Sequence, residues 1–302
     1  NFLLTLCGLR FVASCATTPE PVVIERPQEI QLVKAVHEKN PALNVSIVVF
    51  GKGQGNPALR SAEADYLPSV LRETLIESGH WGAVRVVPRY DPTAEVLVTG
   101  EIRSSNGVDL ELHIKAGDST GRIWIDKDYS DFATDHGYDF DEQYQIEPFK
   151  DLFNLIANDM LEIRESLEAN QLSRVLDTAM LRYAVELSPD VFERYLVKNE
   201  DGTVEVSGLP ARTDPMYSRA RKIRDSEYKF IDIVDEQYEN FYKSMRETYG
   251  YWRRYSYELT EYNEKIEQNG SKRKRSRESV WVAMDDVYRT YKESKMNEDA
   301  LR

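Results

Sequence analysis

A glycine-rich loop with a single lysine is the first place in this sequence where a phosphate could bind. The run Gly51-Lys52-Gly53-Gln54-Gly55 lies between an apolar segment and a helical pattern. Backbone N–H groups in such a loop, together with a helix N-terminus, can hold a phosphate. The spacing fits neither GxxxxGK[ST] nor GxGxxG, and the apolar stripe of the helix begins only at Leu67. We therefore expect a flexible surface loop, with Lys52 the residue to test for ligand binding.

An acidic segment, residues 126–147, has enough carboxylates to ligate calcium in principle. Its acidic side chains include Asp126, Asp128, Asp131, Asp135, Asp139, Asp141 and Glu142. No window has the D-x-[DN]-x-[DN]-G pattern with a glutamate at the twelfth position, so a solvated acidic loop is expected. A partner-binding loop is the alternative, because aromatic residues are interspersed: Tyr129, Phe132, Tyr138, Phe140 and Tyr144.

The other reactive side chains do not form a recognisable catalytic or metal site. The histidines, His37, His80, His113 and His136, are far apart in sequence, and none has HExxH spacing. The cysteines, Cys7 and Cys15, lie near the N-terminus, and no GxSxG motif occurs. The sequence therefore predicts a protein that is not an enzyme, with no metal and no cofactor. A calcium-dependent enzyme with its site in the acidic segment is the least favoured alternative.

Cys15 has the sequence context of a lipidation site. The apolar run that begins Phe2-Leu3-Leu4-Thr5-Leu6 ends in Val12-Ala13-Ser14-Cys15, and a polar, Pro-rich segment follows. This resembles a bacterial lipoprotein signal peptide whose cysteine becomes the acylated mature N-terminus. The run is shorter than the ~20 residues that span a bilayer; an ordinary cleaved signal and a buried terminal helix are the alternatives. Ala16 follows the cysteine, so the resemblance implies attachment to the periplasmic face of the outer membrane.

Composition limits the remaining classes of protein. The chain has 302 residues, 41% of them hydrophobic, enough to bury a core in one large or two ordinary domains. Because both cysteines, Cys7 and Cys15, fall in the expected signal (1–15), no intramolecular disulfide is expected in the folded chain. The formal net charge of −13 repels nucleic acid over most of the surface. Nucleic acid is therefore excluded as a partner.

One concentrated basic patch interrupts this acidic composition near the C-terminus. Its residues are Lys272, Arg273, Lys274, Arg275 and Arg277. The simplest expectation is a solvated loop between helices. The alternative is contact with anionic lipid, lipopolysaccharide or an acidic partner, because each base near a charged membrane contributes about 1 kcal/mol.

The pattern of residues 44–168 predicts an α+β module, a mixed sheet with helices on one face. Strands are expected at Val45–Phe50, Val84–Val87, Ala94–Ile102, Leu110–Ile114 and Ile123–Ile125. One helix is expected to end at Ser78, and a second helix to begin near Glu147. Asn106-Gly107 predicts a hairpin with a type I′ turn. The module is similar to the anticodon-binding-domain-like module of periplasmic proteins. That module occurs in the N-terminal domain of TolB, in the curli secretion channel lipoprotein and in lipoprotein activators of peptidoglycan synthases.

Beyond residue 168 the sequence predicts a helical, Tyr-rich domain. Thr213-Asp214-Pro215 marks the start of a long amphipathic helix that continues to Ile266, with apolar residues at steps of three and four. Asn269-Gly270 ends it, and Val280, Met284, Val287 and Tyr291 predict a shorter helix that folds back. Aromatic residues surround the long helix on more than one face. Candidates for a partner or glycan surface are Tyr242, Tyr251, Trp252 and Tyr257.

Together these features predict four segments: a signal (1–15), a Pro-rich tether (16–43), the α+β module (44–168) and the helical domain (169–302). The expected function is a lipid-anchored periplasmic scaffold or assembly factor that binds other cell-envelope proteins. The alternative is a lipoprotein that binds peptidoglycan or another glycan.

Overall fold

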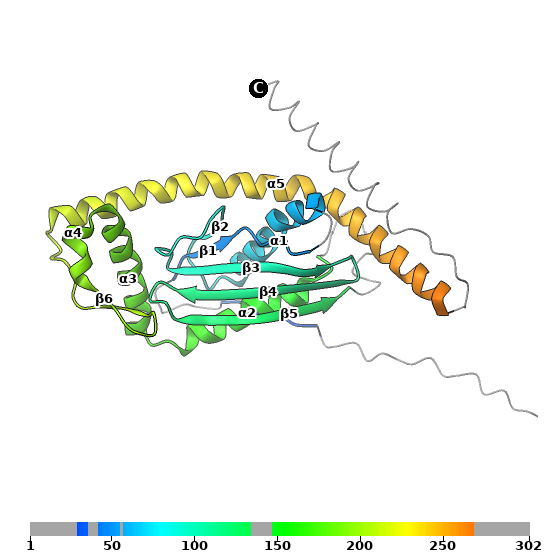
Figure 1. The fold of residues 1–302 in the computed structure, drawn as a ribbon, viewed down its shortest axis with the longest axis horizontal. Helices are drawn as coiled ribbons and strands as arrows, with labels where there is room; N and C mark the ends of the chain where they lie inside the picture. Colours follow the sequence, from blue (N-terminus) through cyan, green and yellow to red (C-terminus); the bar gives the residue numbers. More distant parts are fainter. Residues whose placement is uncertain (1–28, 36–41, 55–56, 134–146, 269–302) are drawn as a thin grey trace, which may run out of the picture.

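The computed structural model describes residues 29–35, 42–54, 57–133 and 147–268 (Figure 1). These residues form a mixed α/β fold in which a five-stranded sheet with helices is followed by one long helix. The fold class and the long C-terminal helix expected from the sequence are therefore confirmed. The shorter helix expected around residues 280–291 lies outside the described residues.

The sheet has the strand order β2-β1-β3-β4-β5. Its strands are β1 (Val45–Val48), β2 (Val84–Val87), β3 (Val96–Ser105), β4 (Asp109–Asp118) and β5 (Ile123–Phe132). β1 is parallel to β2 and β3, whereas β3, β4 and β5 form an antiparallel meander. The helix α1 (Pro57–Ser78) connects β1 to its parallel neighbour β2, as a parallel connection requires.

Helices α1 and α2 (Lys150–Ser166) lie against one face of the sheet (Figure 1). Side chains alternate along the strands, so one set from β4 is buried under the helices: Leu110, Leu112, Ile114 and Ala116. Their neighbours Glu111, His113 and Lys115 face the other way and are more exposed. The polar face of the sheet is therefore open to solvent over its antiparallel part.

The β3–β4 hairpin forms where Asn106-Gly107 predicted it, but the expected type I′ turn is wrong. Gly107 has a φ of +89°, and no described residue other than glycine has a positive φ. A type I′ turn requires a positive φ at both central residues. Instead the Asn106 carboxamide oxygen accepts the backbone N–H groups of Val108 and Asp109 at 2.8 and 2.9 Å, which stabilises a wider loop.

The expectation that 126–147 is a solvated loop is wrong for its first part. Residues 126–132 continue β5. Tyr129 is buried against the helices, and Asp126 and Asp128 point to the open face, whereas Asp131 shares the side of Tyr129 and lies near the start of α2. Residues 134–146, with the remaining expected calcium ligands, lie outside the described part of the chain.

The last helix, α5 (Pro215–Gln268), runs across the module along α1 and the edge strand β2 (Figure 1). Before it lie α3 (Ala169–Leu187), α4 (Pro189–Phe192), a 3-10 turn (Glu193–Tyr195), and the hairpin of β6 (Leu196–Lys198) and β7 (Val204–Val206). Asp214 caps α5 by accepting the N–H groups of Met216 and Tyr217, as its sequence predicted. Core residues of α5, Tyr242, Met245, Tyr249 and Trp252, belong to the same hydrophobic cluster as the sheet. The domain boundary at 168 stays a prediction.

No helix in the described ranges combines the length and the apolar character needed to cross a membrane.

Candidate functional site: a helical surface and a polar pocket

A buried arginine holds the second half of α5 against the module. Arg253 is 1% exposed and pairs with Glu147 through its guanidinium. The same guanidinium lies over the rings of Tyr249, Tyr66 and Phe149, with its central carbon 4.2, 5.6 and 5.4 Å from their centroids. A cation with a carboxylate partner and three ring faces is well stabilised inside a core.

A buried carboxylate on α1 completes this attachment. Glu63 is fully buried and accepts hydrogen bonds from the hydroxyls of Ser105 and Tyr249 at 2.6 and 2.7 Å, and from the guanidinium of Arg60. Burial raises the pKa of Tyr249 well above its usual range, so its hydroxyl remains protonated and donates. Gly107 of the β3–β4 turn lies directly against the α5 backbone. The hairpin, α1 and α5 are therefore joined at one place.

Two further contacts fix the first half of α5. Asp235 accepts the backbone N–H of Val86 at 2.7 Å and pairs with Arg72 at 2.7 Å, so it satisfies a free hydrogen-bonding group of the edge strand β2. Arg224, 5% exposed, donates to the carbonyl of Thr93 and lies between the rings of Tyr183 and Tyr228. One side of α5 is therefore attached along much of its length.

A side of α5 next to the attached one has an exposed apolar stripe in the first half of the helix. The stripe consists of Met216, Ile223, Phe230 and Ile233, which are 40, 42, 65 and 58% exposed. Their separations of seven, seven and three residues place them along one side of a helix. Exposed basic side chains accompany them: Arg219, Lys222 and Lys229. The stripe is therefore apolar with basic neighbours, although the whole chain has a net charge of −13. Such a surface suits an amphipathic partner.

The aromatic residues predicted as a surface are divided between the core and solvent. Tyr242 and Trp252 are 3 and 8% exposed; the Tyr242 hydroxyl donates to Glu73, and Trp252 stacks on Tyr249. Tyr257 is partly buried against the core. Tyr251 is 57% exposed, and it has exposed neighbours one and three turns further along the helix, Tyr255 and Tyr262. Tyr251, together with Tyr255 and Tyr262, is therefore the candidate for an exposed aromatic surface. The buried Tyr242 and Trp252 are not candidates.

The glycine loop extends the sheet, and its lysine is hydrogen-bonded to α1. Gly51 pairs with Glu101 of β3, and the Lys52 ammonium donates to the Ser61 hydroxyl at 2.6 Å. Helix α1 begins at Pro57, earlier than its apolar stripe indicated, because Arg60 and Glu63 are buried as a pair. Lys52 thus lies close to the start of the helix, and a second cation, Arg60, donates from Nε to the Gln54 carbonyl of the same loop at 2.8 Å.

The acidic side chains of β5 are paired across strands with basic residues of β4. Asp126 accepts from Lys115 and His113, both at 3.1 Å, and Asp128 lies 2.8 Å from His113. The bond from Lys115 is the main cause that lowers the pKa of Asp126. No group of three potential metal ligands occurs among the residues that the structure describes.

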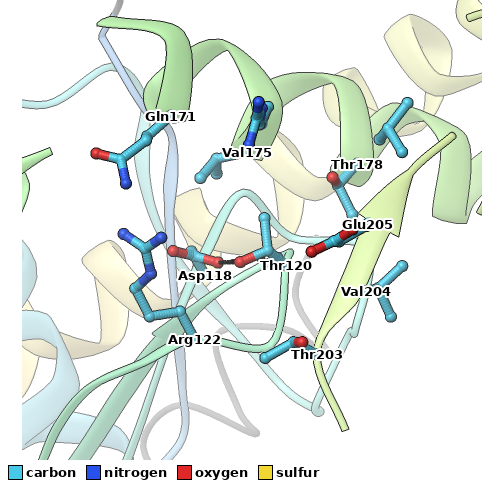
Figure 2. Close-up of a pocket in the computed structure, with 11 residues that line it drawn as sticks. Asp118, Thr120, Arg122, Gln171, Val175, Thr178, Thr203, Val204 and Glu205 are labelled. Atoms are coloured by element: carbon cyan, nitrogen blue, oxygen red, sulfur yellow. Dashed lines mark hydrogen bonds between the residues drawn. The ribbon is translucent and has the colours of Figure 1, made fainter. Parts of the chain in front are cut away.

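A polar pocket of about 350 Å³ lies between the β4–β5 turn, α3 and the β6–β7 hairpin (Figure 2). No motif in the sequence indicated it, because its walls come from separate segments. The charged and polar side chains that line it are Asp118, Thr120, Arg122, Gln171, Arg174, Thr178, Thr203 and Glu205. The lipidation candidate Cys15 and the basic patch at 272–277 lie outside the described residues.

Comparisons with known proteins add little to this geometry. No protein-family model matches the chain, and no curated protein matches it. Among solved structures, it is similar to a crystal structure of a Xanthomonas campestris protein of the family DUF330, at 10% sequence identity. The likeness covers 48% of this chain and 94% of that one, with a TM-score of 0.27. A score this low supports no argument about fold or function.

Proposed function

We propose that this protein is a non-enzymatic, lipid-anchored scaffold of the cell envelope, and that α5 is its partner-binding element. The observation that carries the proposal is the exposed stripe of Met216, Ile223, Phe230 and Ile233 on a 54-residue helix whose other side is attached to the module. The expected anchor rests on the sequence around Cys15 alone.

The stripe suits one kind of partner, an amphipathic helix with acidic residues beside its apolar face. Its seven-residue spacing matches the repeat by which two helices pack side by side. Arg219, Lys222 and Lys229 would contact acidic groups of that helix. Because the adjacent side of α5 is fixed through Arg224, Asp235 and Arg253, the stripe is presented without a large ordering cost.

Replacing Ile223 and Phe230 together by serine should remove partner binding. Burial of two such side chains contributes about 3 kcal/mol or more, so we expect recovery of the partner to fall at least about tenfold. The measurement is affinity purification of the full chain from solubilised envelopes, with partners identified by mass spectrometry. The matched control is Phe132→Ser with Leu187→Ser, two residues equally exposed elsewhere.

Equal recovery of the same partner by both double variants would contradict the role of the stripe. Analytical ultracentrifugation tests whether the chain associates with itself through the stripe. If it does, and if Ile223→Ser with Phe230→Ser abolishes the association, then the partner is a second copy of this chain and the assignment of a different helical partner is overturned.

Glycan binding is a second candidate, favoured by the exposed tyrosines on the C-terminal half of α5. Tyr251, Tyr255 and Tyr262 are each about half exposed, and aromatic faces of this kind can stack on sugar rings. If they do, Tyr251→Ala with Tyr255→Ala should reduce cosedimentation with purified sacculi severalfold. Tyr90→Ala, at an equally exposed tyrosine on the β2–β3 loop, is the control. No binding of the wild-type chain to sacculi would remove this candidate.

A further inference from the structure

The polar pocket beside α3 contains hydrogen-bond donors that have no acceptor. Arg122 of the β4–β5 turn and Arg174 of α3 both line it, and neither has an ion-pair or hydrogen-bond partner among the residues that the structure describes. Most arginines elsewhere in the described chain have an interaction partner, for example Arg60, Arg72, Arg103 and Arg253. Two guanidinium groups on one small cavity therefore offer a place for an anion.

Gln171 adds a third donor whose direction is fixed. Its carboxamide oxygen accepts the backbone N–H of Glu168 at 2.9 Å as part of the capping box that begins α3. The amide nitrogen must then point away from that N–H. Figure 2 shows this nitrogen on the side of the pocket where the guanidinium of Arg122 lies. Donors that face a common space favour an oxyanion between them.

Thr178 supplies independent evidence that the pocket is incomplete by itself. The residue is 1% exposed and lines the cavity, yet its hydroxyl Oγ1 has no hydrogen-bond partner in the described structure. A buried hydroxyl without a partner costs about 1–3 kcal/mol. A polar group of a bound molecule would satisfy it.

The walls of the pocket are held in place by other bonds. The Asp118 carboxylate is occupied by Thr120 and by the indole N–H of Trp124, which fixes the β4–β5 turn. The Ser119 hydroxyl donates to the carbonyl of Val175 on α3 at 2.6 Å. The N–H of Val204 donates to the carbonyl of Thr120 at 2.7 Å, which attaches the β6–β7 hairpin. Asp118 is therefore a positioning residue of the β4–β5 turn.

Glu205 of β7 determines which kind of anion fits. Its carboxylate, unlike that of Asp118, forms no hydrogen bond or ion pair with another residue that the structure describes. Its negative charge disfavours a phosphate dianion more than a monoanion, and it can accept from an ammonium group. We propose that the pocket binds a small zwitterion, with its carboxylate on Arg122 and Arg174 and its ammonium group toward Glu205. A volume of about 350 Å³ suits a free amino acid.

The probes for this proposal are the free L-amino acids and D-alanine, each screened singly by thermal shift on the full chain. The amino acid with the largest shift is then titrated by calorimetry against the matching amine that lacks the carboxylate. We expect saturable binding of the amino acid and none of the amine. Arg122→Gln and Arg174→Gln should each weaken binding about tenfold or more. Arg212→Gln, at an exposed arginine outside the pocket lining, should leave the affinity within about twofold.

Thr178→Val separates a ligand contact from a structural role. The substitution keeps the shape and removes the hydroxyl that has no partner, so the free protein should keep or gain stability. Binding of the amino acid should nevertheless weaken severalfold. Loss of stability in the free protein would show that the hydroxyl has a structural partner and would contradict this step.

The remaining outcomes overturn the assignment. Binding of inorganic phosphate in place of amino acids, with the same dependence on Arg122 and Arg174, would replace the zwitterion by a phosphate ligand. If no probe, phosphate included, changes the melting temperature of the protein, then the pocket is not a binding site for these ligands and the proposal is wrong. Neither result bears on the α5 stripe, which is tested by different variants.

Discussion

Replacing Arg253 by alanine should destabilise the protein by about 3–5 kcal/mol, the range for breaking a buried ion pair at one partner. The substitution leaves the Glu147 carboxylate, 14% exposed, without its partner. It also removes the guanidinium that fills the space between Tyr66, Phe149 and Tyr249. Urea unfolding followed by tryptophan fluorescence measures the loss of free energy, with an unchanged m-value expected if the folded state keeps its compactness.

The next residue along the helix is a matched control for Arg253. Arg254 is 46% exposed at its side chain and pairs with Glu258 one turn away, so Arg254→Ala should cost about 0.5 kcal/mol or less. The double variant Arg253→Met with Glu147→Gln removes both charges together and should recover much of the loss. An Arg253→Ala variant as stable as Arg254→Ala would show that α5 is not held at this point.

The strands of the module could be predicted because their local pattern and their burial agree. Val84–Val87 is a β-branched run bounded by turn residues, and it forms β2 with the predicted limits. The alternation of Leu110, Leu112 and Ile114 likewise corresponds to the buried side of β4. In β4 the apolar residues face a single neighbouring layer, and in β2 the consecutive Val86 and Val87 are buried on both faces; in each strand the local pattern contains the necessary information.

The start of α1 could not be predicted in the same way. Its first turns contain Arg60 and Glu63, which read as a solvent-exposed pair but are 6 and 0% exposed. They are buried because each neutralises the other and because Ser105 and Tyr249, far away in sequence, complete their hydrogen bonds. The type of a residue predicts its exposure only when its hydrogen-bond and ion-pair partners are also close to it in the sequence.

The same reasoning explains why the aromatic surface was only partly predicted and the pocket was not. Tyr242 reads as a residue outside the packing stripe, yet its hydroxyl reaches Glu73 of α1 and its ring packs on Tyr66. The pocket takes Arg122, Gln171 and Glu205 from a turn, a helix and a hairpin. Since no two of these segments share a motif, only the folded arrangement brings their side chains to one cavity.

Gly53→Ala should also be strongly destabilising, by about 2–5 kcal/mol, although the sequence placed this glycine in a flexible loop. Gly53 has a φ of +59°, and a Cβ atom there would lie 1.8 Å from the carbonyl oxygen of Ile102. A left-handed conformation costs an alanine about 1–2 kcal/mol, and forcing extra atoms into a packed region about 1–3 kcal/mol more. The glycine is needed for close approach of the loop to β3, where Gly51 accepts the N–H of Ile102 at 2.9 Å.

Gly208 provides the matched control for Gly53→Ala. It lies in a loop, has no left-handed φ, and a Cβ atom added there meets nothing within 4 Å. Gly208→Ala should therefore change the free energy of unfolding by less than about 0.5 kcal/mol. Lys52→Ala tests the neighbouring position, where only an exposed bond to the Ser61 hydroxyl is lost, and it should be similarly mild. If Gly53→Ala is as mild as both controls, then the loop can separate from β3, and the glycine is not needed for its close approach.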